Sequence, residues 1–310
     1  MKMSMRKAYG ESLVALGAEN PRIVALEADL GKSTMSVLFG QQYPERYFQM
    51  GIAEQNMTSV AAGLALTGYI PLVSSFAVFA SGRPYDQIRS SVCIAHLNVK
   101  ICGSSAGLSD FGDGKTHQSV DDIALMRVLP GMTVLSPADA VETEKMMKAM
   151  AACDGPCYLR VNRNDLETVT DPDDEYHIGK MTCLKEGADV TVFATGVMVG
   201  QALEAAKLLA AENLSVSVVN VSTIKPLDAE AVKRYAGGKR CVVTAEEASI
   251  YGGLGSAICE ALAQEAVPVR VLGIRDSFGT SASNYEELFK YYHLMPEDIA
   301  AKIRATLPKA

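Results

Sequence analysis

Short apolar runs alternate with amphipathic stretches along the first part of the chain. The apolar runs have the length of buried strands and lie at residues 23–26, 47–50, 70–76, 99–102, 133–135 and 157–161. The stretches with helical spacing lie between them, at residues 5–16, 53–68, 84–96, 120–128 and 138–152. This alternation predicts a doubly wound, mostly parallel α/β sheet with helices on both faces and functional loops beyond the strand ends.

The alternation stops at residues 166–182, where the sequence is acidic, contains proline and has no periodicity. We therefore predict a first domain at residues 1–165, a linker at 166–182 and a second domain at 183–310. The second domain is also expected to be α/β, because it repeats the alternation. Its apolar runs lie at residues 190–194, 216–219, 241–244 and 269–272, and helical patterns lie at 200–211, 229–235, 254–266, 285–292 and 296–307.

Glu54 leads a stretch without charge, since residues 55–82 contain no Asp, Glu, Lys or Arg. The stretch is interrupted by glycine and proline, which predicts a buried helix, a turn and a buried strand rather than a membrane span. No Lys or Arg within this run can neutralise the Glu54 carboxylate, so its partner must come from elsewhere. Spacing leaves two interpretations open: a first-turn acid that favours the helix dipole, or a buried carboxylate that holds a ring nitrogen of a ligand.

Composition narrows the class of protein. The 310 residues are 48% hydrophobic and carry a formal net charge of −7, without a basic cluster, so a nucleic-acid surface is not expected. The seven cysteines are odd in number and form no Cys-x-x-Cys pair, which predicts reduced thiols in a cytoplasmic protein and no zinc site. The first residues lack the apolar core of a signal peptide, so neither secretion nor a membrane anchor is expected.

The segment 109–119 is the richest in reactive side chains, since it combines Asp110, Asp113, Lys115 and His117 between a predicted strand and a predicted helix. A single histidine in a polar loop is more often a surface residue, but the edge of a parallel sheet is where such folds bind ligands. Gly112-Asp-Gly114 is similar to the start of a thiamine-diphosphate metal motif. The next asparagine is Asn162, too far along the chain, so we predict no metal site here.

Other candidate residues each have two interpretations. Phe76 and Phe79 are either core residues or a wall that stacks on a ring. Arg160 and Arg163 end the last strand of the first domain and are either a solvated pair or an anion clamp. The glycines of residues 252–255 open a helix, where they form either a tight turn or an anion cradle.

Three segments together resemble the transketolase family. Residues 47–57 resemble its Gly-x-x-Glu-His/Gln motif, residues 112–118 its Gly-Glu-Asp-Gly-x-Thr-His-Gln loop, and residues 245–255 a signature of its C-terminal domain. The resemblance covers essentially the whole chain and corresponds to the pyrimidine-binding domain followed by the C-terminal domain. The family's diphosphate-binding domain is not found in it. This arrangement is similar to split transketolases, in which two polypeptides make one enzyme.

The resemblance implies roles for individual residues. Ser105 stands where the family usually has a histidine, and Gly82 where a third aromatic residue is common, which implies a reshaped phosphate site and a looser ring pocket. The remaining implied roles concern the cofactor, the donor sugar's hydroxyls and the substrate phosphate. They place Glu54 at N1′ of the aminopyrimidine, Phe76 and Phe79 around that ring, Asp29 near the thiazolium, Asp113 and the catalytic His117 at the hydroxyls, and Arg6, Ser33 and Arg163, with Ser105, at the phosphate.

The resemblance implies a function that we state as an expectation. The chain is expected to be the C-terminal subunit of a transketolase that uses thiamine diphosphate and moves a two-carbon ketol unit from a ketose phosphate to an aldose phosphate. An N-terminal partner subunit would bind most of the diphosphate and the Mg²⁺, in an α2β2 assembly. One alternative is the β subunit of a 2-oxo-acid dehydrogenase, which the Thr116-His117 loop disfavours. Another is a non-catalytic partner, which the intact Glu54 disfavours.

Overall fold

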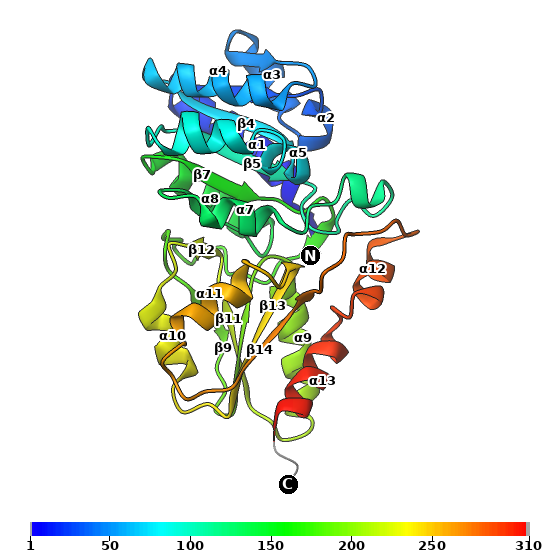
Figure 1. Ribbon diagram of the computed structural model, residues 1–310. Helices are drawn as coiled ribbons and strands as arrows, with labels where there is room; N and C mark the ends of the chain where they lie inside the picture. Colours follow the sequence, from blue (N-terminus) through cyan, green and yellow to red (C-terminus); the bar gives the residue numbers. More distant parts are fainter. Residues whose placement is uncertain (1, 308–310) are drawn as a thin grey trace.

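The apolar runs of the first domain form one sheet of parallel strands in the computed structural model, which describes residues 2–307 (Figure 1). Parallel strands that are buried on both faces are apolar throughout, which is why these runs lack strict alternation. The order across the sheet is β6, β7, β5, β4, β2 and β3. The bounds are β2 (Ile23–Glu27), β3 (Tyr47–Gln49), β4 (Ile70–Phe76), β5 (Lys100–Ser104), β6 (Thr133–Leu135) and β7 (Cys157–Arg160).

Helices cover both faces of this sheet, because successive side chains of each strand point to opposite sides. On β2, Val24 and Leu26 pack with one helical layer, and Ile23 and Ala25 pack with the other. The first layer contains α4 (Glu54–Leu66), the π-helical turn η2 (Ile88–Cys93) and α7 (Asp122–Val128). The second contains α1 (Met5–Glu19), α3 (Val37–Gln42) and α8 (Ala140–Ala152). Shorter helical segments are α2 (Gly31–Thr34), η1 (Pro44–Arg46), α5 (Ala77–Ser81), α6 (Tyr85–Gln87) and η3 (Gly114–Thr116).

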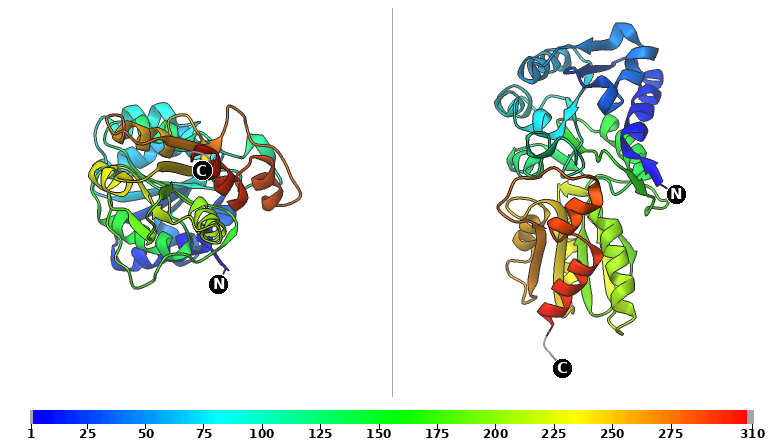
Figure 2. Two further views of the ribbon diagram at one scale, coloured as in Figure 1. Left: turned by 90° about the horizontal axis from the view of Figure 1, so that it is seen from below. Right: turned by 90° about the vertical axis from the view of Figure 1, so that its right-hand side faces the viewer.

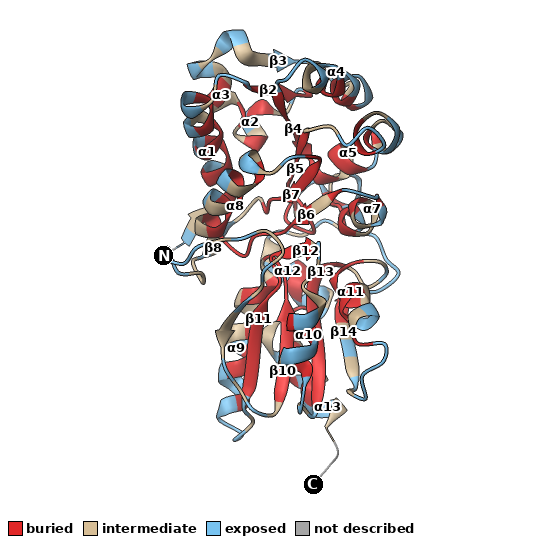
Figure 3. Ribbon diagram, turned by 90° about the vertical axis from the view of Figure 1, so that its left-hand side faces the viewer, coloured by how far each residue is buried: buried red, intermediate tan, exposed pale blue. Residues whose placement is uncertain are grey.

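The second domain is a smaller sheet of the same kind, and Figure 2 shows the two domains stacked end to end. Its order is β14, β13, β10, β11 and β9, of which β9 alone is antiparallel to its neighbour. Buried residues follow the strands of both domains (Figure 3). The bounds are β9 (Thr182–Lys185), β10 (Val190–Ala194), β11 (Val216–Asn220), β13 (Cys241–Ser249), β14 (Val269–Ile274), α9 (Met198–Ala210), α10 (Ala229–Ala236), α11 (Leu254–Ala261), α12 (Tyr285–Tyr291) and α13 (Pro296–Thr306).

The predicted fold class is confirmed, since both domains are α/β with largely parallel sheets. Helices α9 and α13 cover one face of the second sheet, and α10 and α11 cover the other. Within residues 2–307 we find no helix with the length and apolar character needed to span a bilayer.

Four short strands are absent from the sequence-based assignment, among them β9, and two of the four connect distant parts of the chain. The first is β8 (Asp165–Glu167), which pairs with β1 (Lys2–Ser4) at the start of the segment predicted to be a linker. The second is β12 (Thr223–Lys225), which belongs to the second domain in sequence but pairs antiparallel with β6 at the edge of the first sheet. Both strands are three residues long. Segments this short carry no recognisable period, so the sequence pattern missed them.

A buried polar network joins the domains. Arg160 of β7 donates from Nε to Asp122 Oδ2 at 2.9 Å and from Nη2 to the carbonyl oxygen of Glu247 at 2.8 Å. The Glu247 carboxylate accepts from the Leu108 amide at 2.8 Å and from the Tyr285 hydroxyl at 2.7 Å. Arg160 is only 5% exposed. It is therefore neither a solvated arginine nor an anion clamp, but part of the joint between the domains.

The neighbouring Glu246 explains the glycines of residues 252–255. Its carboxylate accepts from the amides of Leu254 at 2.7 Å and Gly255 at 2.8 Å, at the start of α11. A side chain at Gly253 would collide with this carboxylate, because an added Cβ would lie 2.1 Å from Glu246 Oε2. The helix start is therefore occupied by the protein's own anion rather than open to a ligand.

The buried Glu246 predicts a pH-dependent stability. Burial raises its pKa to about 7, although the two backbone amides lower it. A carboxyl whose pKa is raised on folding contributes stability that is complete below its unfolded pKa of about 4.5 and is lost as pH rises through about 7. We expect Glu246→Gln to remove this loss, so that the fall in the free energy of unfolding between pH 5 and pH 8 becomes smaller by on the order of 3 kcal/mol.

Urea unfolding of both proteins at pH 5 and pH 8 measures the difference. The matched control is Glu204→Gln, which removes an exposed carboxylate paired with Lys207 and should leave the wild-type pH dependence intact. The prediction would be contradicted if the free energy of unfolding fell by the same amount between pH 5 and pH 8 in the wild type and in Glu246→Gln.

Candidate active site

Most of the predicted site residues follow the carboxyl ends of the parallel strands β2, β3, β4, β5 and β7, while Arg6 lies in the first turn of α1. Carboxyl ends of parallel strands meet at one edge, where such folds bind their ligands. Asp29 follows β2, Ser105 follows β5 and Arg163 follows β7, while Phe76 is the last residue of β4. Chain segments that are distant in sequence therefore meet at one place.

Three aromatic rings form a wall at this edge. Phe76 and Phe79 stack with their ring centroids 6.0 Å apart, and the His117 ring stands edge-on to both, at 6.2 and 5.3 Å. Phe79 lies on the short helix α5, which follows directly after the strand end that carries Phe76. The turn from β4 into α5 brings both phenyl rings to the same side. The two phenyl rings of the wall present an apolar surface, and the imidazole ring of His117 adds a polar edge to it.

Glu54 lies in the first turn of α4 and is 3% exposed. Its Oε1 accepts a charge-assisted hydrogen bond of 2.7 Å from Arg83 Nη1, and the Arg83 guanidinium lies over the Phe79 ring, 4.0 Å from the centroid. Arg83 is the partner that the sequence did not identify. The signal was present, because Arg83 is the first charged residue after the charge-free run that ends at Gly82.

A second part of the site gathers positive charge. Arg6 donates from Nε to the carbonyl oxygen of Arg163 at 3.0 Å and from Nη1 to the carbonyl oxygen of Ser33 at 2.8 Å. Burial and the neighbouring Arg163 charge lower the pKa of Arg6. Two guanidinium groups held this close favour an anion beside them. Three of the four residues assigned to phosphate binding, Arg6, Ser33 and Arg163, therefore lie together.

Asp110 connects the cationic part of the site to the loop. Its Oδ2 accepts from Arg163 Nη1 at 2.8 Å, while the Arg163 guanidinium lies 5.7 Å from the Phe76 ring centroid. Burial raises the pKa of Asp110, and the Arg163 charge opposes that shift. Sequence analysis noted Asp110 within the loop but gave it no role. The structure shows that it holds Arg163 against the aromatic wall.

Three predicted site residues have less direct support. Asp29 is exposed, has a φ of +60° and accepts from Gln49 Nε2 at 3.0 Å. Asp113 is exposed before the turn η3. Ser105 is fully buried with a φ of +51°, and its Oγ has no hydrogen-bond partner within residues 2–307. A substrate would have to reach Ser105 through the surrounding side chains, so its role at a phosphate stays a prediction.

The residues present fit one end of a thiamine cofactor. A buried carboxylate beside an aromatic wall suits the aminopyrimidine, and the cavity lined by residues 52–56 and Arg83 has a volume of about 600 Å³. Asn162 is engaged within the protein, because its Oδ1 accepts from the Asn164 amide at 2.8 Å and its Nδ2 donates to the Tyr285 hydroxyl at 2.7 Å. Among residues 2–307 no group of three His, Cys, Asp or Glu side chains is placed to hold a metal. The buried carboxylate and the aromatic wall therefore fit the pyrimidine ring.

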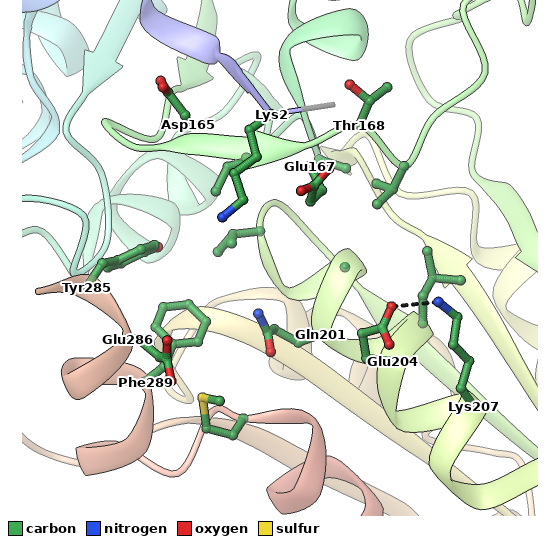
Figure 4. A pocket seen from close by; sticks show the side chains of 17 residues that line it. Lys2, Asp165, Glu167, Thr168, Gln201, Glu204, Lys207, Tyr285, Glu286 and Phe289 are labelled. Atoms are coloured by element: carbon green, nitrogen blue, oxygen red, sulfur yellow. Dashed lines mark hydrogen bonds and ion pairs between the residues drawn. The ribbon is translucent and has the colours of Figure 1, made fainter. Parts of the chain in front are cut away.

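A separate cavity of about 760 Å³ lies between the domains (Figure 4). Lys2 and Asp165 line it from the first domain, and Tyr285 and Phe289 line it from α12. None of the residues assigned above to the cofactor or the substrate is among its lining residues. The cavity belongs to the domain junction rather than to the candidate active site.

The fold and this site define one half of a thiamine-diphosphate-type enzyme, a pyrimidine-binding domain followed by a second α/β domain. Residues 1–168 match the family described as transketolase, pyrimidine binding domain, and residues 179–299 match transketolase, C-terminal domain. The chain belongs to the transketolase family. Family members depend on thiamine diphosphate, which agrees with the shape of the ring site.

Relatives of similar length include proteins named as a transketolase C-terminal section and as a transketolase subunit. The chain is 43% identical to a putative transketolase C-terminal section of Methanocaldococcus jannaschii, covering 98% of this chain and 96% of that protein. It is 45% identical to a 6-deoxy-6-sulfo-D-fructose transketolase subunit of a Clostridium species, covering 89% and 86%. A solved structure described as a split gene transketolase, an inactive β4 tetramer, is 46% identical with a TM-score of 0.90 and covers 99% of both chains. Human transketolase is 34% identical, but this chain spans only 50% of it.

Proposed function

We propose that this chain is the C-terminal subunit of a transketolase that moves a two-carbon ketol unit from a ketose, or ketose phosphate, to an aldose phosphate. The observation that carries the proposal is the continuous row of side chains from Glu54 to Arg6. In it, a buried carboxylate and a ring wall lie beside a pair of guanidinium groups. A ring-binding site next to an anion-binding site suits a thiamine cofactor and a phosphorylated sugar.

When bound, thiamine diphosphate supplies the carbon nucleophile that carries the transferred unit. In the proposal, Glu54 holds N1′ of the aminopyrimidine and shares a proton with it, and Phe76 and Phe79 fix the ring and exclude water. His117 lies against Phe79, where it can exchange a proton with a sugar hydroxyl. Arg6 and Arg163 bind the anionic end of the sugar.

The identity of the sugar rests on weaker support. Relatives include a subunit named for 6-deoxy-6-sulfo-D-fructose and, at 35% identity, an apulose-4-phosphate transketolase subunit of Phocaeicola vulgatus. Both names specify sugars with an anionic group. The guanidinium pair is suited to such a group, and Ser105 in place of the family histidine is consistent with a reshaped anion site. We therefore propose an anionic sugar as donor or acceptor.

We propose that a partner subunit completes the enzyme. It would bring the diphosphate-binding domain and most of the Mg²⁺ ligands, and two copies of each chain would form an α2β2 assembly with two active sites. A relative named as a transketolase C-terminal section and a solved structure described as a split gene transketolase support this view. The seven cysteines are all free thiols, which is consistent with a cytoplasmic complex.

Assay of the reconstituted complex against a panel of donors tests the function. The panel contains ketose phosphates, sulfonated ketoses and 2-oxo acids, each with an aldose phosphate acceptor. Transfer of a two-carbon unit from a ketose supports the proposal. Decarboxylation of 2-oxo acids without ketose cleavage would instead identify a β subunit of a 2-oxo-acid dehydrogenase, and inactivity with every donor would favour a non-catalytic partner.

His117 and Asp113 give a prediction on donor selection. If they bind hydroxyls of the donor, His117→Ala and Asp113→Ala should lower kcat/KM for the preferred donor by roughly 10- to 100-fold, because a lost hydrogen bond to a buried hydroxyl costs about 1–3 kcal/mol. Steady-state kinetics with donors of both hydroxyl configurations measures the effect. Lys115→Ala in the same loop is the control. Wild-type discrimination in both variants would contradict the roles.

A further inference from the structure

Arg83 occupies the place where the proposed ring site is formed. Its Nη1 donates to Glu54 Oε1 at 2.7 Å, and its guanidinium lies 4.0 Å from the centroid of the Phe79 ring. Glu54 is almost completely buried, whereas 46% of the Arg83 side chain is exposed. The guanidinium thus covers an apolar ring face and a buried carboxylate at the same time.

These are the two contacts that an aminopyrimidine would need from this chain. A guanidinium is planar and delocalised, stacks on an aromatic face and presents N–H groups to a carboxylate. An aminopyrimidine held by Glu54 stacks on the same face and presents a protonated ring nitrogen to the same oxygen atoms. The ring and the guanidinium would overlap, so both cannot occupy the site.

The chain around Arg83 explains why the side chain rests there. Gln55 donates from Nε2 to the carbonyl oxygen of Arg83 at 3.2 Å, which ties this backbone to the first turn of α4. A buried carboxylate without a counter-charge is strongly unfavourable, so Glu54 retains a cation when no ligand is present.

We propose that Arg83 is a placeholder for the aminopyrimidine: it fills the ring site in the unloaded subunit and must turn out into solvent before the ring can bind. This inference rests on the proposed function, because it takes Glu54 and Phe79 as the ring site. Arg83 already borders solvent and its side chain is long, so it can leave without movement of the core. Binding competes with the Arg83 contact, so the apparent affinity for the ring is reduced by the fraction of sites that Arg83 fills.

Binding of the pyrimidine fragment alone tests the placeholder. The probe is 4-amino-5-hydroxymethyl-2-methylpyrimidine, titrated calorimetrically into the intact purified chain, so that no partner or catalytic activity is required. Arg83→Met keeps the length of the side chain and removes the guanidinium, and we expect at least about tenfold tighter binding than in the wild type. Arg89→Met, which removes an exposed arginine from η2, is the control and should bind as the wild type does.

Arg83→Gln provides a second variant in case Arg83→Met does not fold, and circular dichroism checks the fold of each. Arg83→Gln also supports the proposal if it binds the pyrimidine fragment clearly more tightly than the wild type, even by less than tenfold. Unchanged or weaker binding in a folded Arg83 variant overturns it, as does undetectable binding to the wild type and both variants. Weaker binding in particular would make Arg83 a ligand of the ring instead of its substitute.

A double variant separates this inference from the proposed function. Adding Glu54→Gln to Arg83→Met should abolish the tighter binding of the pyrimidine fragment, because the ring nitrogen loses its carboxylate. If Arg83→Met tightens binding and Glu54→Gln leaves that gain unchanged, the ring does not lie at Glu54, and the ring site of the proposed function is wrong. If binding depends on Glu54 but not on Arg83, only the placeholder is wrong.

Discussion

Replacing Glu54 by glutamine should reduce turnover of the reconstituted enzyme by about 10³-fold, within the range seen when a primary acid-base group is removed. Glutamine keeps the shape of the side chain and can still form a hydrogen bond. It cannot share a proton with N1′ of the ring, because an amide is neither a comparable acid nor a comparable base. Glu54 is 3% exposed, so water is poorly placed to substitute for the lost carboxylate.

The measurement is kcat for the purified complex at saturating donor, acceptor, thiamine diphosphate and Mg²⁺. Loss of the Arg83 contact could also weaken the fold, so thermal unfolding of the variant must be compared with the wild type. Ser59→Ala, which changes an exposed residue of α4 outside that cavity, is the matched control and should retain most of the turnover. Turnover near the wild-type value in a folded Glu54→Gln complex would remove Glu54 from its proposed role.

The isolated chain should show no transketolase activity, even with saturating thiamine diphosphate and Mg²⁺. In the proposal this chain supplies the ring site and the anion site, and the partner supplies the metal-diphosphate site. Without a metal-diphosphate site, the cofactor would be held only through its ring, where Arg83 competes for the same contacts. We expect activity to increase by at least about 10³-fold when a partner with the diphosphate-binding domain is added, since catalysis requires a correctly positioned cofactor.

Titration of the chain with the candidate partner, followed by activity and native mass, measures this dependence. Activity should saturate at equal numbers of the two chains, and the complex should contain two of each. A heat-denatured partner serves as the control. Full activity of the chain by itself, after mass spectrometry has excluded a co-purified polypeptide, would refute the division of the enzyme between two subunits.

The sequence predicted the fold well because the strands are buried on both faces. Runs such as Ile23–Glu27 must then be apolar throughout, and the helices between them need an apolar stripe, so both signals are strong. The same reasoning predicted which strand ends meet, because parallel topology fixes them. It could not assign the three residues of β12, whose pairing with β6 depends on contacts far apart in the sequence.

The residues of the candidate site were likewise predicted only in part from the sequence. Arg6, Ser33 and Arg163 were assigned together from a family resemblance, and the structure brings them together through backbone contacts that no spacing rule describes. The partner of Glu54 was missed for a different reason. Arg83 lies 29 positions along the chain from Glu54, beyond a strand and a short helix, so only the folded structure makes them neighbours. Helical or strand periodicity carries no information about such pairs.

The sheet of the first domain includes a strand from the second half of the sequence, β12. The domain boundary in the structure therefore differs from the boundary along the chain. Thr223–Lys225 completes the hydrogen bonding of β6, and Lys225 Nζ also donates to the carbonyl oxygen of Arg127 at 2.8 Å. A protease cut within residues 166–182 would therefore leave two pieces that still share one sheet. A fragment of residues 1–165 would instead expose the backbone of β6 as an open edge that invites aggregation. A chimera that exchanges the second domain for that of a relative exchanges part of the first sheet as well.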